Sequence, residues 1–306
     1  MRMEDERESR NVEDRRGQRG GLPRPGAGGG FPGFPGRGMP GGRRAPVGRI
    51  GGLGLVAILL ISLLLGVDPG ALLSQLDGGP PITQQQTAQP PSAPPASDAE
   101  ARFVSRVLAS TEDVWAAEFA RAGQRYEAPR LVIFEGGVQS GCGFARAAQG
   151  PFYCPADKRV YIDLGFFRDM ERRLGAPGDF AQAYVIAHEV GHHVQNLLGI
   201  LPRAHRAQQQ AGEREANAIS VAIELQADCL AGFWARRADE MRGILERGDI
   251  EEGLNAASAV GDDRLQHAAG QRVTPDSFTH GTSAQRVAAF RRGLAAPDAN
   301  ACLRQG

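Results

Sequence analysis

The sequence predicts an α+β domain that is mostly helical and carries a small β-sheet near its start. Residues 101–123 place apolar side chains at helical spacing and stop at Gly123, which predicts a long helix. Two short runs of β-branched and aromatic residues follow, at 130–135 and 159–164, and these predict two strands.

Helical patterns dominate the rest of the chain. One helix is expected to begin near Gly178, continue through Leu198 and stop at Gly199. Further helices are expected at 213–240, 249–268 and 283–294. Because these patterns follow one another without an internal repeat, residues 99–306 are expected to form one folded domain.

The chain before this domain differs in composition. Residues 1–49 are rich in Arg, Gly and Pro and lack periodic apolar residues, so we expect a disordered arm. Residues 68–98 are dominated by Pro, Gln, Ser, Gly and Ala, which is the composition of a linker.

Between the arm and the linker, residues 50–67 form an apolar run without a charge. As a helix it would extend roughly 27 Å, close to the hydrocarbon thickness of a bilayer, so one transmembrane helix is expected. The alternatives are a buried core helix and the apolar stretch of a cleaved signal peptide. Because Arg43, Arg44 and Arg49 precede the run, the positive-inside rule predicts a single-pass membrane protein with a cytoplasmic N-terminus and an extracytoplasmic domain.

Charge and cysteine content limit the partners and the compartment. The 35 basic and 35 acidic residues balance, so no nucleic-acid partner is expected. The four cysteines, Cys142, Cys154, Cys229 and Cys302, are compatible with two disulfides outside the cytoplasm. Cys142 with Cys154 is the natural loop pair and leaves Cys229 with Cys302, although spacing alone allows three connectivities. Four free thiols are the alternative if the topology is different.

The string HEVGH at 188–192 lies within the helix expected at 178–198. Residues at i and i+4 share one face of a helix, so His188 and His192 can reach the same metal ion. Glu189 then lies beside the open coordination position. The alternative is that both histidines are ordinary helix residues.

The third ligand is expected from the helix at 213–240. A known pattern that continues the motif with Gly and His fails here, because Gln195 and Leu198 stand at those positions. Glu224 and Asp228 instead occupy i and i+4 on one face of the later helix. Glu224 would bind the metal, and Asp228 would accept the outer N–H of a ligand histidine. The alternative is a solvated acidic stripe.

Two histidines and one glutamate leave the fourth position of a zinc ion to water, which is typical of catalytic sites. A structural site would fill that position and would have no use for Glu189. In the catalytic interpretation, one Zn²⁺ activates the water, and Glu189 takes its proton as general base and later delivers one to the leaving amine. His280, in a loop before the last helix, could stabilise the oxyanion; otherwise Thr282 or Ser283 simply caps that helix.

Several segments carry a resemblance to a known family: the Arg- and Gly-rich start with its apolar run, YCPADKRVYIDLGFF, AHEVGHHVQNLLGI, ELQADCLAGFWA and DSFTHGTSAQRVAAF. Through them, nearly the whole chain resembles the bacterial family described as putative neutral zinc metallopeptidases. That family resembles the gluzincin branch of the zincins. The resemblance implies a zincin-like domain with His188, His192 and Glu224 as ligands and Glu189 as base. It also implies that the strand around Tyr161 is an edge strand that pairs with a peptide substrate.

Two hypotheses for function follow. The first is a membrane-anchored zinc peptidase, in particular an endopeptidase, that hydrolyses envelope or extracellular polypeptides. The second is a catalytically silent binding or assembly protein that is tethered to the membrane and retains the zincin fold. The presence of Glu189 favours the first, because a silent relative would be expected to have lost its base.

Overall fold

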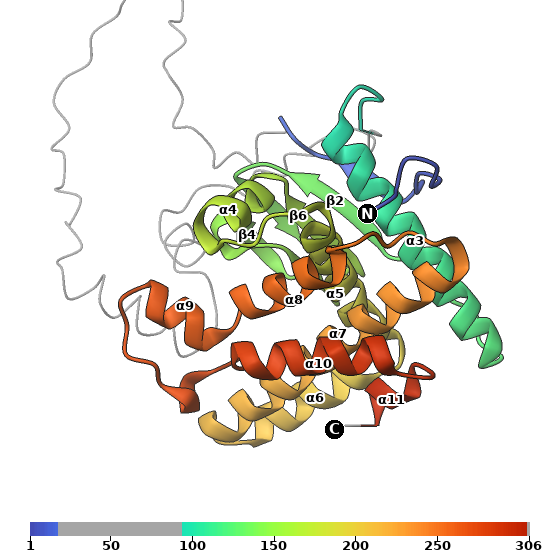
Figure 1. Cartoon of the computed structure of the whole chain (residues 1–306). Helices are drawn as coiled ribbons and strands as arrows, with labels where there is room; N and C mark the ends of the chain where they lie inside the picture. Colours follow the sequence, from blue (N-terminus) through green and yellow to red (C-terminus); the bar gives the residue numbers. More distant parts are fainter. Residues whose placement is uncertain (18–93, 305–306) are drawn as a thin grey trace, which may run out of the picture. The chain divides into compact units, whose positions relative to one another are not determined.

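The computed structural model describes residues 1–17 and 94–304 (Figure 1). Helix α3 (Ala99–Arg121) is the first helix of the longer stretch. The Asp98 side chain caps it by accepting the N–H of Ala101, and Glu100 lies in the favourable first turn. The helix expected at 101–123 is therefore confirmed, with both ends displaced by two residues.

Four strands form the main sheet, in the order β1-β2-β6-β5. Their bounds are Val12–Asp14 for β1, Arg130–Phe134 for β2, Phe152–Cys154 for β5 and Arg159–Asp163 for β6. β1 and β6 lie parallel to β2, whereas β5 is antiparallel to β6. β3 (Gly137–Ser140) and β4 (Gly143–Arg146) form a separate hairpin. The two expected strands are confirmed as β2 and β6.

The strand around Tyr161 is not an edge strand, so that expectation was wrong. β6 lies between β2 and β5, and both of its edges are therefore paired. Tyr161 itself is fully buried, and its hydroxyl donates to Asp157 Oδ2 at 2.6 Å. The covering strand β5 follows directly after Pro151 and is only three residues long, too short to produce a clear alternating pattern.

Residues 1–17 are ordered, which corrects part of the expected disorder. Met1, Met3 and Val12 belong to the hydrophobic core, and β1 extends the sheet beside β2. The composition of the whole arm concealed this short segment, because the Gly- and Pro-rich residues follow it. The remainder of the arm, the expected transmembrane run at 50–67 and most of the linker lie outside the described residues.

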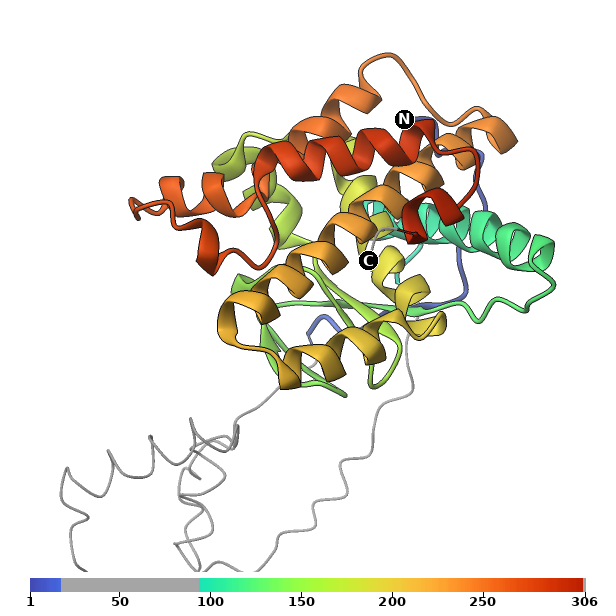
Figure 2. The same ribbon diagram turned by 90° about the horizontal axis from the view of Figure 1, so that it is seen from below.

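The other helices stack beside the sheet in the α+β arrangement expected from the sequence (Figures 1 and 2). They are α4 (Gly165–Leu174), α5 (Asp179–Leu197), α6 (Ile200–Gln210), α7 (Glu213–Arg242), α8 (Asp249–Ala259), α9 (Asp262–Ala268), α10 (Ser283–Ala295) and α11 (Asn300–Leu303). α5 is the central helix, because it packs against α3, β5, β6, α7 and α8. Gly199 has a φ of +71°, a conformation that glycine adopts readily and that separates α5 from α6.

α7 and α10 approach each other through glycines. A Cβ atom on Gly232 would lie 2.1 Å from Phe290 O, and one on Gly293 would lie 1.9 Å from Cys229 O. Larger residues at either position would push the two helices apart. In the described part of the chain, α7 is the one helix long and apolar enough to cross a membrane, yet 56% of its apolar window is buried in the domain.

Two disulfides connect the expected pairs, Cys142 with Cys154 and Cys229 with Cys302. The first joins the β3–β4 hairpin region to the edge strand β5. The second attaches α11 to α7 across a sequence separation of 73 residues. Both therefore close loops around the helices and strands that position the candidate site.

Candidate metal centre

Two helices bring the three expected ligands together. α5 carries His188 and His192 one turn apart, and α7 places Glu224 against both rings. His188 Nε2 lies 3.1 Å from Glu224 Oε2, and His192 Nε2 lies 3.3 Å from Glu224 Oε1. Three ligand atoms, one from each residue, lie within 4.8 Å of one another.

Gly191 allows α7 to come this close to α5. A Cβ atom at this position would lie 3.1 Å from Ala227 O and 3.2 Å from its Cα, tighter than ordinary van der Waals contact. The HEVGH string therefore supplies two ligands and also the small residue that admits the helix carrying the third.

The spacing between each histidine and Glu224 is compatible with a shared zinc ion. Ligand atoms about 2.1 Å from such an ion lie roughly 3.4 Å apart, and the Nε2 atoms of His188 and His192 lie 3.1 and 3.3 Å from the two carboxylate oxygens of Glu224. The electrostatics agree with this geometry. Burial lowers the pKa of His188, but Asp228 and Glu224 outweigh burial and raise this pKa to about 10. Asp228 and Glu224, which stabilise positive charge on His188, would equally stabilise a metal cation bound in place of the proton.

The outer nitrogen of each ligand histidine has its own partner. His188 Nδ1 donates to Asp228 Oδ1 at 2.8 Å, and His192 Nδ1 donates to Gln195 Oε1 at 2.8 Å. Gln195 is itself held, because its amide donates to Ile223 O at 2.8 Å. Both Nε2 atoms are thereby left to face Glu224, which is the orientation that metal ligation requires.

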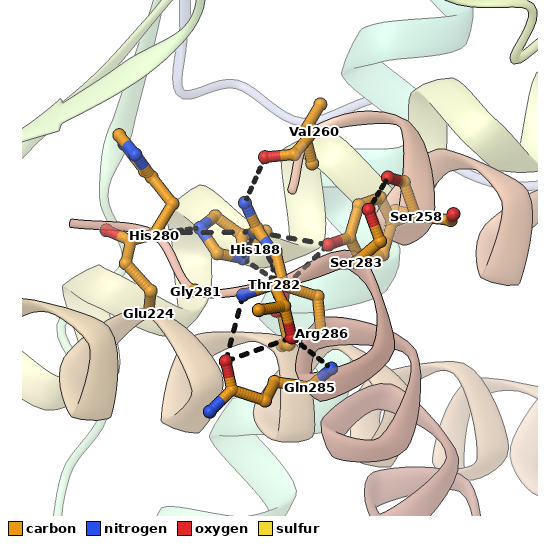
Figure 3. A network of polar contacts seen from close by, with 12 residues as sticks. His188, Glu224, Ser258, Val260, His280, Gly281, Thr282, Ser283, Gln285 and Arg286 are labelled. Atoms are coloured by element: carbon orange, nitrogen blue, oxygen red, sulfur yellow. Dashed lines mark hydrogen bonds and ion pairs between the residues drawn. The ribbon is translucent and has the colours of Figure 1, made fainter. Parts of the chain in front are cut away.

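Asp228 is the centre of a buried network that fixes His188. Tyr184 Oη donates to Asp228 Oδ1 at 2.5 Å, and Arg286 on α10 donates to both carboxylate oxygens, at 2.8 and 2.9 Å. Burial opposes ionisation of Asp228, but Arg286 and His188 outweigh it and lower the pKa to about 2. Figure 3 shows Arg286 reaching from α10 to the side of His188. Asp228 is therefore a fixed negative charge behind the ligand.

Glu189 lies within the same buried surroundings, with 7% of its surface exposed. Burial raises its pKa above the usual carboxyl value, partly offset by His188 and His192. A carboxylate with a raised pKa is suited to accept a proton and return it near neutral pH.

His280 has a different partner. Its Nδ1 lies 3.1 Å from Asp262 Oδ1, and half of its side chain is exposed. Thr282 caps α10 by accepting the N–H of Gln285, the alternative that the sequence had left open (Figure 3). The oxyanion role of His280 stays a prediction.

A cavity of about 450 Å³ opens beside the ligand cluster. Its wall includes the apolar residues Pro155, Leu201, Pro202 and Ile223, together with Glu224 from the ligand cluster. The cavity therefore connects the candidate centre with a space large enough for a side chain of a bound molecule.

The sequence did not reveal three of the residues that support the site: Tyr184, Gln195 and Arg286. Tyr184 stands four residues before His188, so helical spacing could have indicated it. Gln195 similarly stands three residues after His192. Arg286 lies 58 residues from Asp228, and no spacing rule connects the two.

Comparison with known proteins places the chain in a family. The chain is 50% identical over 302 residues to the uncharacterized protein YpfJ of Escherichia coli (strain K12), which covers 99% of this chain and 98% of that protein. It is 41% identical over 255 residues to the uncharacterized protein Rv2575 of Mycobacterium tuberculosis (strain ATCC 25618 / H37Rv), covering 79% and 84% respectively. No solved structure shows a significant match. A family model described as "Putative neutral zinc metallopeptidase" matches residues 1–304, and the chain belongs to this family.

Proposed function

We propose that the protein is a zinc peptidase that hydrolyses peptide bonds with Glu189 as its general base. The convergence of His188, His192 and Glu224 on one point carries this proposal, because it provides three ligands for one zinc ion and leaves the fourth position open. Glu189 adjoins the ligands without belonging to the ligand cluster, as a general base should.

The residues of the chain divide the chemistry between them. Zinc bound at this centre would supply Lewis-acid activation of water and of the substrate carbonyl. Glu189 accepts the proton of the attacking water and passes a proton to the amine nitrogen as the C–N bond breaks. Asp228 and Gln195 keep the two imidazoles oriented throughout.

Polypeptides are the proposed substrates. The cavity beside Glu224 would receive an uncharged side chain, because its other lining residues include no Asp, Glu, Lys or Arg. The two disulfides favour an oxidising compartment for the domain, and therefore envelope or extracellular polypeptides as substrates.

The test is zinc content and cleavage of a peptide pool by the purified full-length chain. We expect about one zinc per chain and cleavage in the wild type. Glu189→Gln should keep the metal and lose turnover, whereas Glu224→Ala should lose the metal. Glu215→Ala, at an exposed position of the same helix, is the matched control. A chain that binds zinc and cuts no peptide would support the silent binding protein instead.

A further inference from the structure

Residues 1–17 are built into the domain that carries the metal centre. Val12, Glu13 and Asp14 pair in register with Leu131, Val132 and Ile133. Asn11 O accepts the N–H of Leu131 at 2.8 Å, and Arg15 N donates to Ile133 O at 2.8 Å. The segment thereby covers the edge of β2, which would otherwise be open for pairing with another chain.

Three side chains of the segment converge on one carboxylate of α3. Glu112 is 8% exposed and accepts from Ser9 Oγ at 2.6 Å, Asn11 Nδ2 at 2.8 Å and Arg7 Nη2 at 2.9 Å. Without residues 1–17, this carboxylate would lose all three donors. A buried carboxylate without donors is unfavourable, so the domain surface is shaped for the segment.

A second buried carboxylate belongs to the segment itself and pairs with arginines of the sheet. Glu13 is 3% exposed, and Arg130 of β2 donates to it at 2.8 Å. Arg159 of β6 lies 3.5 Å from the same oxygen. Both partners lie in the domain, so the buried carboxylate of Glu13 depends on the domain for its ion pairs.

Apolar contacts and a backbone hydrogen bond complete the attachment. Met3 is 3% exposed within the main core, and Arg2 N donates to Ile244 O at 2.8 Å. The attachment thus extends from the end of α7 across α3 to β2. Backbone pairing, the ion pairs of two buried carboxylates and core packing all place the segment and the domain in direct contact.

We propose that residues 1–17 and 94–304 lie on the same side of the membrane. A strand cannot pair across a hydrocarbon layer about 30 Å thick, and β1 pairs directly with β2. A single crossing anywhere between the two stretches would place them on opposite sides. Under this proposal, the single-pass topology expected from the apolar run would not apply. This proposal is independent of the peptidase activity.

Single cysteines in the full-length chain test the proposal. The four native cysteines are paired in disulfides, so an engineered thiol is the reactive one. Glu8→Cys reports on the segment and Arg214→Cys on the domain, since their side chains are 46% and 82% exposed. Each variant is treated with a membrane-impermeant maleimide in intact and in lysed spheroplasts. The wild-type chain is the control for background labelling.

The two variants should label alike. Either both react in intact spheroplasts, or both react only after lysis, and each result places the two positions on one side. Reaction of one variant in intact spheroplasts and of the other only after lysis would overturn the proposal.

A double variant tests the contact itself. Arg102 Nε lies 2.9 Å from Glu8 Oε1, so the thiols of Glu8→Cys with Arg102→Cys should be bridged within one chain by a short bis-maleimide cross-linker. Glu8→Cys with Arg214→Cys is the control. This control pair should not cross-link, because Arg214 lies far from the segment. Arg242 contacts Glu6 of the segment and lies about 40 Å along α7 from Arg214. Failure of the first pair to cross-link, with both thiols free in the folded chain, would likewise refute the proposal.

Discussion

Replacing Arg286 with methionine should destabilise the domain and weaken zinc binding together. Arg286 is 3% exposed, and its guanidinium holds the fully buried Asp228 through bonds of 2.8 and 2.9 Å. Removing one partner of a buried ion pair costs about 3–5 kcal/mol of unfolding free energy, because the remaining charge stays out of water. Burial would then raise the pKa of Asp228, which Arg286 helps to hold at about 2.

The effect on the metal follows from the same contact. An Asp228 that is protonated or displaced no longer orients His188 through Nδ1. Loss of such a partner lowers metal affinity roughly 10–100-fold. Urea unfolding of the metal-free chain measures the first effect, and competition with a chromophoric chelator measures the second.

A double-mutant cycle separates the ion pair from general packing. Arg286→Met should cost much less in an Asp228→Asn background, because no buried charge is then left without its partner. Arg291→Met, at an exposed position of the same helix, should change neither quantity. The reasoning is refuted if Arg286→Met unfolds at the wild-type urea concentration and binds zinc with wild-type affinity.

Three further predictions concern the ligand helix and its metal. Gly191→Ala should reduce zinc affinity in chelator competition and cost about 1–3 kcal/mol in urea, because the added methyl meets Ala227 at 3.1 Å; Gly212→Ala meets nothing within 4 Å and should leave zinc affinity unchanged. Burial lowers the pKa of His193 to about 4. Since this folded-state pKa lies below the unfolded value, the unfolding free energy should fall by roughly 3 kcal/mol between pH 6.5 and pH 4. His193→Gln should make the unfolding free energy from urea titrations less dependent on pH over this range. An unchanged pH dependence in the variant would contradict the assignment to His193. Zinc at 100 times its Kd should raise the unfolding free energy of the wild type by about 2.7 kcal/mol. Glu224→Ala should abolish this increment in thermal unfolding, and a variant that keeps the full increment would contradict the role of Glu224 as a ligand.

Local patterns predicted much of the fold and most of the ligand cluster. The helical period placed His188 and His192 on one face of α5, and the same period placed Glu224 and Asp228 on one face of α7. Each of these relations spans four residues, so the geometry of a single helix determines it. The strands β2 and β6 were also predictable, because their β-branched and aromatic residues form continuous runs.

Short or interrupted signals were missed or misinterpreted. β5 has three residues, so the sequence did not show that another strand covers Tyr161. Residues 1–17 carry a real strand, but the glycines and prolines after them dominate the composition of the arm. In both cases, pairing with a distant strand stabilises a segment whose own pattern is weak.

The sequence by itself predicted the three residues that the structure brings together as a candidate metal cluster and the helices that carry them. Only the tertiary structure decided that Arg286 neutralises Asp228 and that β1 belongs beside β2, across separations of 58 and 119 residues. The physical reason is that helical geometry relates residues one turn apart. Contacts between distant segments depend instead on which buried charges and strand edges remain unpaired once the helices and strands have packed.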